Sequence, residues 1–177
     1  MPFTSPGDVT TGTTITSTWG NAVGDAIDLL ANPPRARAVH STTQSLTSGA
    51  WTAVALDTEN WDSDGMHSTV TNNSRFTAAT AGKYNVEGAV RFATNGTGLR
   101  GIGVRVNGTG GTGPTVTCMV IAPFSGDVTV LNCVTEVSLA VGDWVELVAL
   151  QTSGGALNLV NSTLEGNPFC AVRWTGT

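Results

Sequence analysis

The segment that most constrains the fold is KYNVEGAVRF, because its apolar and polar residues alternate along the chain. One face would carry Tyr84, Val86, Val90 and Phe92, and the opposite face would carry Lys83, Asn85, Glu87 and Arg91. Side chains of a β-strand point alternately to its two faces, so this period of two predicts a half-buried strand. The chain must therefore supply a second apolar layer to cover it.

The same kind of pattern recurs through residues 38–177. Further candidate strands, separated by Gly, Asn, Asp and Pro turns, lie at 38–44, 51–56, 75–79, 101–106, 115–122, 127–138, 143–151 and 168–174. About nine short strands at this spacing predict an all-β sandwich or jelly roll. The 22 glycines and a charged share of only 12% favour short strands and turns over surface helices.

Residues 1–37 differ from the rest of the chain. Residues 1–14 show no period and predict an extended arm, which TSTWGNAVGDAIDLLANPP follows. Ser17 or Thr18 can cap a helix there, and the Asn-Pro-Pro sequence at 32–34 must end it, because proline disfavours a helical residue before it. We therefore expect an arm and one short α-helix in front of the β-domain.

The expected helix is amphipathic, with apolar residues at helical spacing at Trp19, Val23, Ala26, Ile27 and Leu30. At about 12–15 residues, with two glycines inside it, the helix would be marginal alone and needs a surface to pack on. Its apolar face could cover the body of its own chain, or it could bind copies of itself or a larger assembly. We expect the second, with the anchoring residues Trp19, Val23, Ile27 and Leu30.

Two candidate strands are apolar on both faces. The first is DWVELVALQ, where Trp144, Val148 and Leu150 alternate with Val145, Leu147 and Ala149, and the second is VTCMVIA at 116–122. A sandwich strand needs only one buried face, so the second face needs another cover. A subunit interface is the economical cover, because exposed apolar patches of that size invite association. These strands therefore predict an oligomer.

Charge and composition argue against several classes of function. The net charge of −5, with a single lysine, argues against a nucleic-acid partner, which needs clustered Lys and Arg. No apolar run approaches the ~20 residues of a membrane-spanning helix, and the N-terminus has no secretory-signal pattern. Cys118, Cys133 and Cys170 lie in strand-like apolar contexts, and we interpret them as small buried hydrophobes rather than a disulfide framework or metal site.

Four motifs follow one another along the chain: RFTAATAGKYNVEGAVRF, RVNG, SLAVGDWVELVAL and NPFCAVRW. They resemble the globular domain of complement C1q and its tumour-necrosis-factor-like (TNF-like) relatives. The matching positions are Phe76, Thr77, Gly82, Tyr84, Asn107, Gly108, Leu139, Gly142, Asp143 and Val145. The resemblance implies a C1q/TNF-like jelly roll that assembles as a homotrimer. The residues expected in the trimer core or interface are Tyr84, Val86, Phe92, Trp144, Val145, Leu147 and Phe169.

The chain departs from that family at both ends. AVRWTGT replaces the usual F-S-G-x-L ending, and no collagen repeat precedes the domain. The opening residues instead resemble bacteriophage particle proteins, in which a G-x-x-(I/V)-T-x-x-x-W-N-x-x-(V/I)-x-D stretch precedes a β-rich module. Gly12–Asp25 carries this stretch, with Gly20 inserted before Asn21, and DTENWDSDGMHSTVTNNSR resembles a segment of phage structural proteins with a C1q-like domain.

The densest group of chemically capable side chains is WDSDGMHS, at 61–68. Neither this segment nor its His67 belongs to a known catalytic sequence motif, so we expect no enzyme activity. An EF-hand is rejected because Thr71 stands where the bidentate glutamate belongs. Two interpretations stay open: a structural loop whose acids accept backbone N–H bonds, and a calcium site built from Asp57, Asp62 and Asp64. No other cofactor is expected.

Together these patterns predict a non-enzymatic phage virion structural protein, assembled in the host bacterial cytoplasm. It would be a trimeric knob anchored to other virion proteins by residues 1–37. We expect a tail-tip or fibre component. Two interpretations of its polar loops at 94–100 and 107–115 stay open: contacts with a host-surface glycan or protein, and inert turns. The alternative is a capsid decoration protein that stabilises the head, and a further alternative is a free carbohydrate-binding module. The sequence does not separate head from tail.

Overall fold

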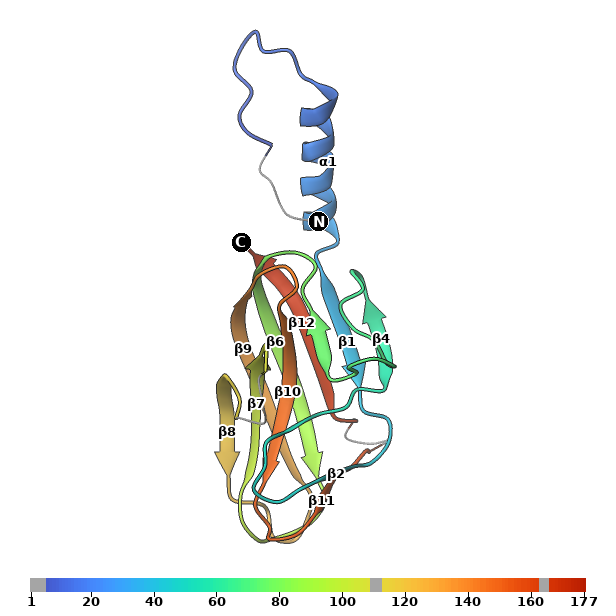
Figure 1. Cartoon of the computed structure of the whole chain (residues 1–177), viewed down its shortest axis with the longest axis vertical. Coiled ribbons are helices and arrows are strands. Elements are labelled where there is room, and N and C mark those ends of the chain that lie inside the picture. The colour runs from blue at the N-terminus through green and yellow to red at the C-terminus, as the bar shows by residue number, and fades with distance from the viewer. Residues whose placement is uncertain (1–5, 109–112, 163–165) are drawn as a thin grey trace.

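The computed structural model describes residues 6–108, 113–162 and 166–177, which form one α-helix and twelve β-strands in two sheets (Figure 1). The large sheet contains β1 (Arg35–Val39), β2 (Gln44–Leu46), β4 (Thr58–Asp62), β6 (Gly82–Phe92), β9 (Thr129–Leu139), β11 (Leu157–Leu159) and β12 (Phe169–Gly176). The small sheet contains β3 (Thr52–Ala53), β5 (Arg75–Thr77), β7 (Arg100–Val106), β8 (Val116–Ile121) and β10 (Trp144–Gln151). The strands that sequence patterns did not predict are β2, β4 and β11.

Long strands distant in sequence lie side by side in the large sheet. β6 pairs antiparallel with β12 on one side and β9 on the other, and β1 lies beyond β12 with β4 at the edge. In the small sheet β10 pairs with β7, which pairs with β8, while β3 and β5 pair with the other side of β10. The first strand therefore lies beside the last, as in Greek-key folds. The predicted all-β jelly-roll sandwich is confirmed.

The core lies between the two sheets and follows the alternation of β6. Its inward residues, all fully buried, are Tyr84, Val86, Val90 and Phe92. Gly88 completes this face, where an added Cβ would come within 2.8 Å of Leu147 Cδ1 from the opposite sheet. The predicted half-buried strand is therefore confirmed, with a close approach of the two sheets at its centre.

Most residues expected at a trimer interface belong to the interior of the single chain. Those fully buried in its core are Tyr84, Val86, Phe92, Val145 and Leu147, so they are unavailable to a partner. Phe169 and Trp144 remain half-buried at the surface. The second face of β10 is also covered within the chain, since Val148 is fully buried and Glu146 nearly so. The inference that β10 needs a subunit to cover it was wrong.

The predicted N-terminal helix is α1 (Ser17–Ala31), and it projects away from the sandwich (Figure 1). Thr16, rather than Ser17 or Thr18, is the N-cap, and its Oγ1 accepts a hydrogen bond of 3.2 Å from Trp19 N. No residue of α1 is buried, although Leu29 contacts the core. The helix therefore does not cover the body of its own chain.

No helix in the described part of the chain is long and apolar enough to span a membrane.

Two of the three cysteines are paired, which corrects the prediction that all three are simple buried hydrophobes. Cys118 of β8 and Cys133 of β9 form a disulfide that joins the edges of the two sheets. Sequence patterns missed this pair because the two strands meet only through the sandwich topology. Cys170 is free and fully buried, and burial raises the pKa of its thiol.

The burial of Tyr84 predicts a large cost for its removal. Tyr84→Ala should lower the free energy of unfolding by about 3–5 kcal/mol, the usual range for truncating a large core side chain. Tyr84→Phe is the matched control: it keeps the ring and loses only the 2.6 Å hydrogen bond to the Thr80 carbonyl, at a cost of about 1 kcal/mol. Denaturant unfolding measures both values, and an unchanged midpoint for Tyr84→Ala would contradict the burial.

The same residue predicts a loss of stability at high pH. Burial, with a contribution from the Asp64 carboxylate, raises the pKa of Tyr84 from 10.0 to about 12. Because the folded pKa lies above the unfolded one, this stabilisation is complete below pH 10 and is lost as the pH rises towards 12. Tyr84 is the only tyrosine, so tyrosinate absorbance reports its titration alone. Titration near pH 10 in the folded protein would refute the shift.

The disulfide predicts a redox-dependent stability. The double variant Cys118→Ala/Cys133→Ala should lose about 3 kcal/mol of unfolding free energy, since a cross-link between residues 15 apart restricts the unfolded chain. Reductant should lower the melting temperature of the wild-type protein and leave that of the double variant unchanged. An identical melting temperature of the wild type with and without reductant would rule out a stabilising disulfide.

Candidate interaction surface

The WDSDGMHS segment forms a corner of the fold. It begins at the end of β4, and Asp62 organises it: its Oδ1 accepts from Asp64 N at 3.0 Å and its Oδ2 from His67 N at 2.8 Å. The His67 ring packs on Phe76, with ring centroids 4.8 Å apart, and its Nε2 lies 3.1 Å from the Asn73 carbonyl oxygen. The Asp62 carboxylate and the His67 ring therefore hold the turn in place.

Asp57 lies apart from that corner and has its own partners. Its carboxylate accepts hydrogen bonds from Ser41 N at 2.7 Å and Thr42 Oγ1 at 3.1 Å. Burial raises the pKa of Asp57, but hydrogen bonds from Ser41, Thr58 and Thr42 outweigh it and hold the pKa below its ordinary value. Among the described residues no three His, Cys, Asp or Glu side chains group as metal ligands. The calcium set of Asp57, Asp62 and Asp64 is therefore not assembled.

Two motif residues shared with the C1q-like pattern have a clear structural role. Asn107 adopts a positive φ of 46° and donates from Nδ2 to Asp143 Oδ1 at 2.7 Å, while its Oδ1 accepts from Trp144 N at 2.9 Å. Asp143 Oδ2 accepts from Ala140 N at 2.8 Å. The pair joins the ends of β7 and β10, so the motif encodes strand alignment rather than ligand binding.

The loop at 94–100, expected to contact a partner, is held from inside. Arg100 is fully buried, and its guanidinium donates to the carbonyl oxygens of Asn95, Thr97 and Leu99 at 2.7, 3.0 and 2.9 Å. Desolvation lowers the pKa of Arg100. The loop backbone is thus fixed by its own chain. The second expected loop, 107–115, includes residues 109–112, which lie outside the described residues.

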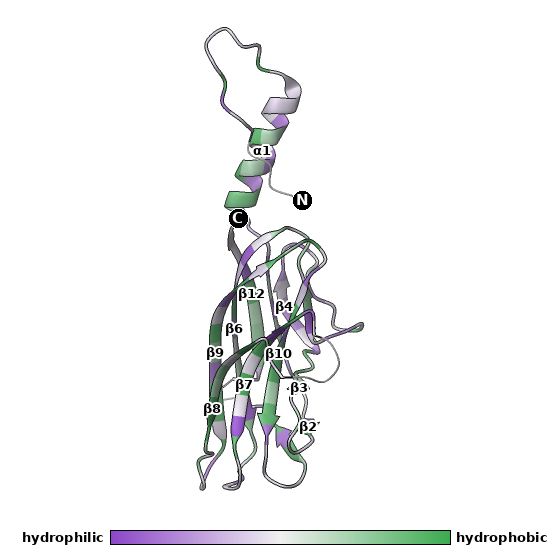
Figure 2. Cartoon of the chain, turned by 60° about the vertical axis from the view of Figure 1, so that its left-hand side comes forward, coloured by the Kyte–Doolittle hydropathy of each residue, from purple (hydrophilic) through white to green (hydrophobic). Residues whose placement is uncertain are grey.

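The clearest candidate for a contact with another molecule is a set of exposed apolar residues on β8, on β9 and between them, here called the edge patch. Its exposed residues are Met119, Val120 and Ile121 of β8, Phe124 of the β8–β9 connection, and Val130 and Val134 of β9. Phe124 is 68% exposed and Val134 69%. Figures 1 and 2 show β8 and β9 together at this edge. Sequence patterns indicated β8 as a strand in need of a cover, and missed Phe124 and Val134.

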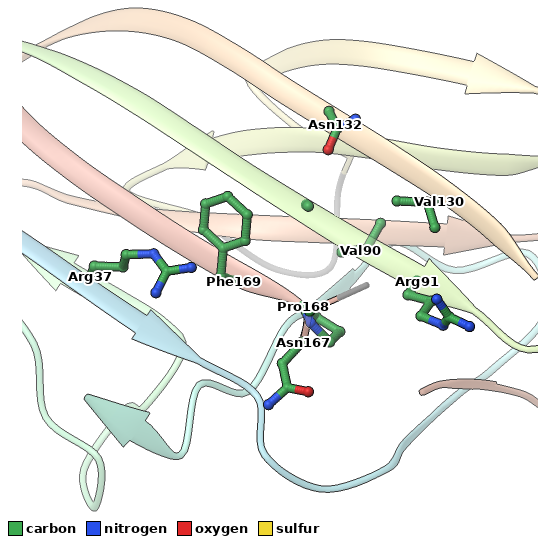
Figure 3. A pocket seen from close by; sticks show the side chains of 10 residues that line it. Arg37, Val90, Arg91, Val130, Asn132, Asn167, Pro168 and Phe169 are labelled. Carbon is green, nitrogen blue, oxygen red and sulfur yellow. The ribbon is translucent and has the colours of Figure 1, made fainter. Parts of the chain in front are cut away.

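A cavity of about 270 Å³ lies next to the edge patch, on the outer face of the large sheet (Figure 3). Its polar lining consists of Arg37, Arg91, Asn132 and Asn167, and it shares Val130 with the edge patch. The Arg37 guanidinium lies 4.5 Å from the centre of the Phe169 ring. Guanidinium and amide groups around an aromatic ring suit a carboxylate or a hydroxyl-rich group. Val130 therefore belongs both to the edge patch and to the lining of this cavity.

Comparisons with known proteins bear on the fold. No protein-family model and no curated protein matches the chain. Among solved structures, murine APRIL is similar, with a TM-score of 0.58 and 14% identity over 80% of this chain and 98% of that one. The globular domain of zebrafish complement 1qA matches with a TM-score of 0.52 and 13% identity, over 78% of this chain and 92% of that one.

A third structure agrees with these two. Eiger TNF from S. frugiperda matches with a TM-score of 0.53 and 11% identity, over 82% of this chain and 94% of that one. The chain has a C1q/TNF-like fold. The resemblance inferred from the sequence motifs is therefore confirmed for the fold, and identities this low carry no information about partners.

Proposed function

We propose that this chain is a non-enzymatic, homotrimeric structural knob of a bacteriophage virion, attached to the particle by its N-terminal segment. We place it at a tail tip or fibre, where its free end could contact a host-surface glycan or protein. The C1q/TNF-like fold supports the knob. The observation that carries the proposal is the edge patch, because an exposed apolar patch of this kind marks an association surface.

A closed threefold arrangement would use both the edge patch and the outer face of the large sheet, which carries the cavity. In a heterologous ring, the edge of one subunit packs against a different surface of the next. The edge patch is apolar, and the outer face of the large sheet offers the half-buried Phe169 and the nearly buried Ala171 as a complementary surface. Phe169 thus remains a candidate interface residue, while the buried residues of β6 support it from behind.

The assignment to a phage particle rests on the sequence resemblance of Gly12–Asp25 and of the segment around WDSDGMHS. The Cys118–Cys133 disulfide is compatible with it. Disulfides persist in oxidising surroundings, so the bond would close once the particle has left the reducing cytoplasm in which it is assembled.

The trimer makes a direct prediction about mass in solution. Light scattering on the purified chain should give the mass of three chains, and Val134→Lys should reduce it by placing a charge in the edge patch. Val70→Lys is the matched control, because Val70 is 89% exposed and lies outside the patch, so it should leave the mass unchanged. A wild-type mass of one chain at micromolar concentration would refute the trimer.

The position on the particle is tested on intact virions. Gold-labelled antibody against the β-domain should bind at the tail end. Label on the shell faces would replace the tail assignment with the capsid decoration alternative. Absence of the protein from purified particles would contradict both and favour a free binding module.

A further inference from the structure

The helix α1 carries an apolar stripe with coiled-coil spacing. Trp19, Val23, Ala26 and Leu30 are separated by four, three and four residues, which places them at successive core positions of a heptad pattern. Ile27 and Leu29 flank the stripe on its two sides. An apolar face this wide exceeds the narrow seam between two helices and suits contact with two neighbouring helices at once.

The single chain leaves this stripe without adequate cover. Ile27 is 58% exposed and Leu30 70%, and no residue of α1 is buried. Leu29 packs against the core of the sandwich, and the indole Nε1 of Trp19 donates to the Gly7 carbonyl oxygen at 3.2 Å. A helix of 15 residues containing two glycines is marginal in water. Its persistence requires a partner for the stripe.

We propose that the partner is α1 of the two other copies, so that three α1 helices form a short parallel bundle above the three sandwiches. This inference rests on the proposed trimer and identifies what its N-terminal segment does. Two arguments favour a second copy over an unrelated protein. The heptad spacing is self-complementary, and Asp25 and Asp28 lie away from the stripe, so identical helices can approach without opposing charges.

Continuity with the sandwich supplies a third argument. α1 runs through residues 32–34 into β1, a strand of the large sheet whose outer face is the proposed subunit surface. It extends along the long axis of the molecule (Figure 1), and Figure 2 shows hydrophobic segments along its length. A threefold trimer brings three copies of this exit point together, which raises the local concentration of α1 and offsets the shortness of the helix.

The bundle changes which residues attach the knob to the particle. Trp19, Val23 and Leu30 would face other copies of the chain rather than another virion protein. Attachment then falls to the exposed arm before Thr16 and to the polar face of α1. The N-terminal unit would therefore have two parts, a trimeric stalk and the arm that precedes it.

Cysteine cross-linking of the full chain tests the bundle. Ala26→Cys places a thiol in the stripe, and Asp28→Cys, on the opposite side of the same helix, is the matched control. The native cysteines do not interfere, because two are paired and Cys170 is buried. Under mild oxidation, Ala26→Cys should give at least tenfold more interchain disulfide than Asp28→Cys. Equal cross-linking of the two variants, or none in a protein with the mass of three chains, overturns the bundle.

A second variant measures the helix itself. Val23→Asp/Leu30→Asp should abolish the helical circular dichroism of α1, whereas Asn21→Asp, on the polar side, should retain it. Neither variant touches the core of the sandwich, so the β-sheet dichroism should remain native. Helical signal that survives the double substitution would refute the inference while leaving the trimeric sandwich intact. A wild-type mass of one chain would instead defeat the proposed trimer, and the bundle with it.

Discussion

Leu147 of β10 packs directly over Gly88 of β6 between the two sheets, and the core of the sandwich depends on this contact. A Cβ at position 88 would lie 2.8 Å from Leu147 Cδ1 and 2.9 Å from the Phe169 carbonyl oxygen, so no side chain fits there. Tyr84 and Phe92 fill the wider space at either end of the same strand face. Because β6 also pairs with β12 and β9, its position sets the register of both neighbours.

Charged side chains cover the outward face of β10, on the side opposite the contact with Gly88. Glu146 of β10 is only 4% exposed, and its carboxylate accepts hydrogen bonds from Arg105 at 2.8 Å and from Ser74 at 2.6 Å. The Arg75 guanidinium lies 3.9 Å from the centre of the Trp144 ring. These contacts cover the second face of β10 from within the chain. By contrast, Phe124 and Val134 at the neighbouring edge are exposed within the described part of the chain, which is why we propose the association surface there.

Sequence patterns predicted the long strands, but they missed several short strands that pair with them. The alternation in β6 and the Asn-Pro-Pro end of α1 are local signals, because each depends on residues within one element. The strands they missed, such as β4 and β11, are short and owe their existence to pairing with distant partners. The same limitation hid the Cys118–Cys133 pair, whose strands belong to different sheets.

The sequence by itself determined the all-β class and the helix with its apolar stripe, since these follow from local periodicity and turn chemistry, and its motifs carried the resemblance to C1q-like domains. Only the tertiary structure decided which apolar residues remain available to a partner. Val134 and Leu147 are both apolar strand residues, but one is 69% exposed at an edge and the other is fully buried between the sheets. That difference arises from strand order, because the side chains that cover a strand come from segments far away along the chain.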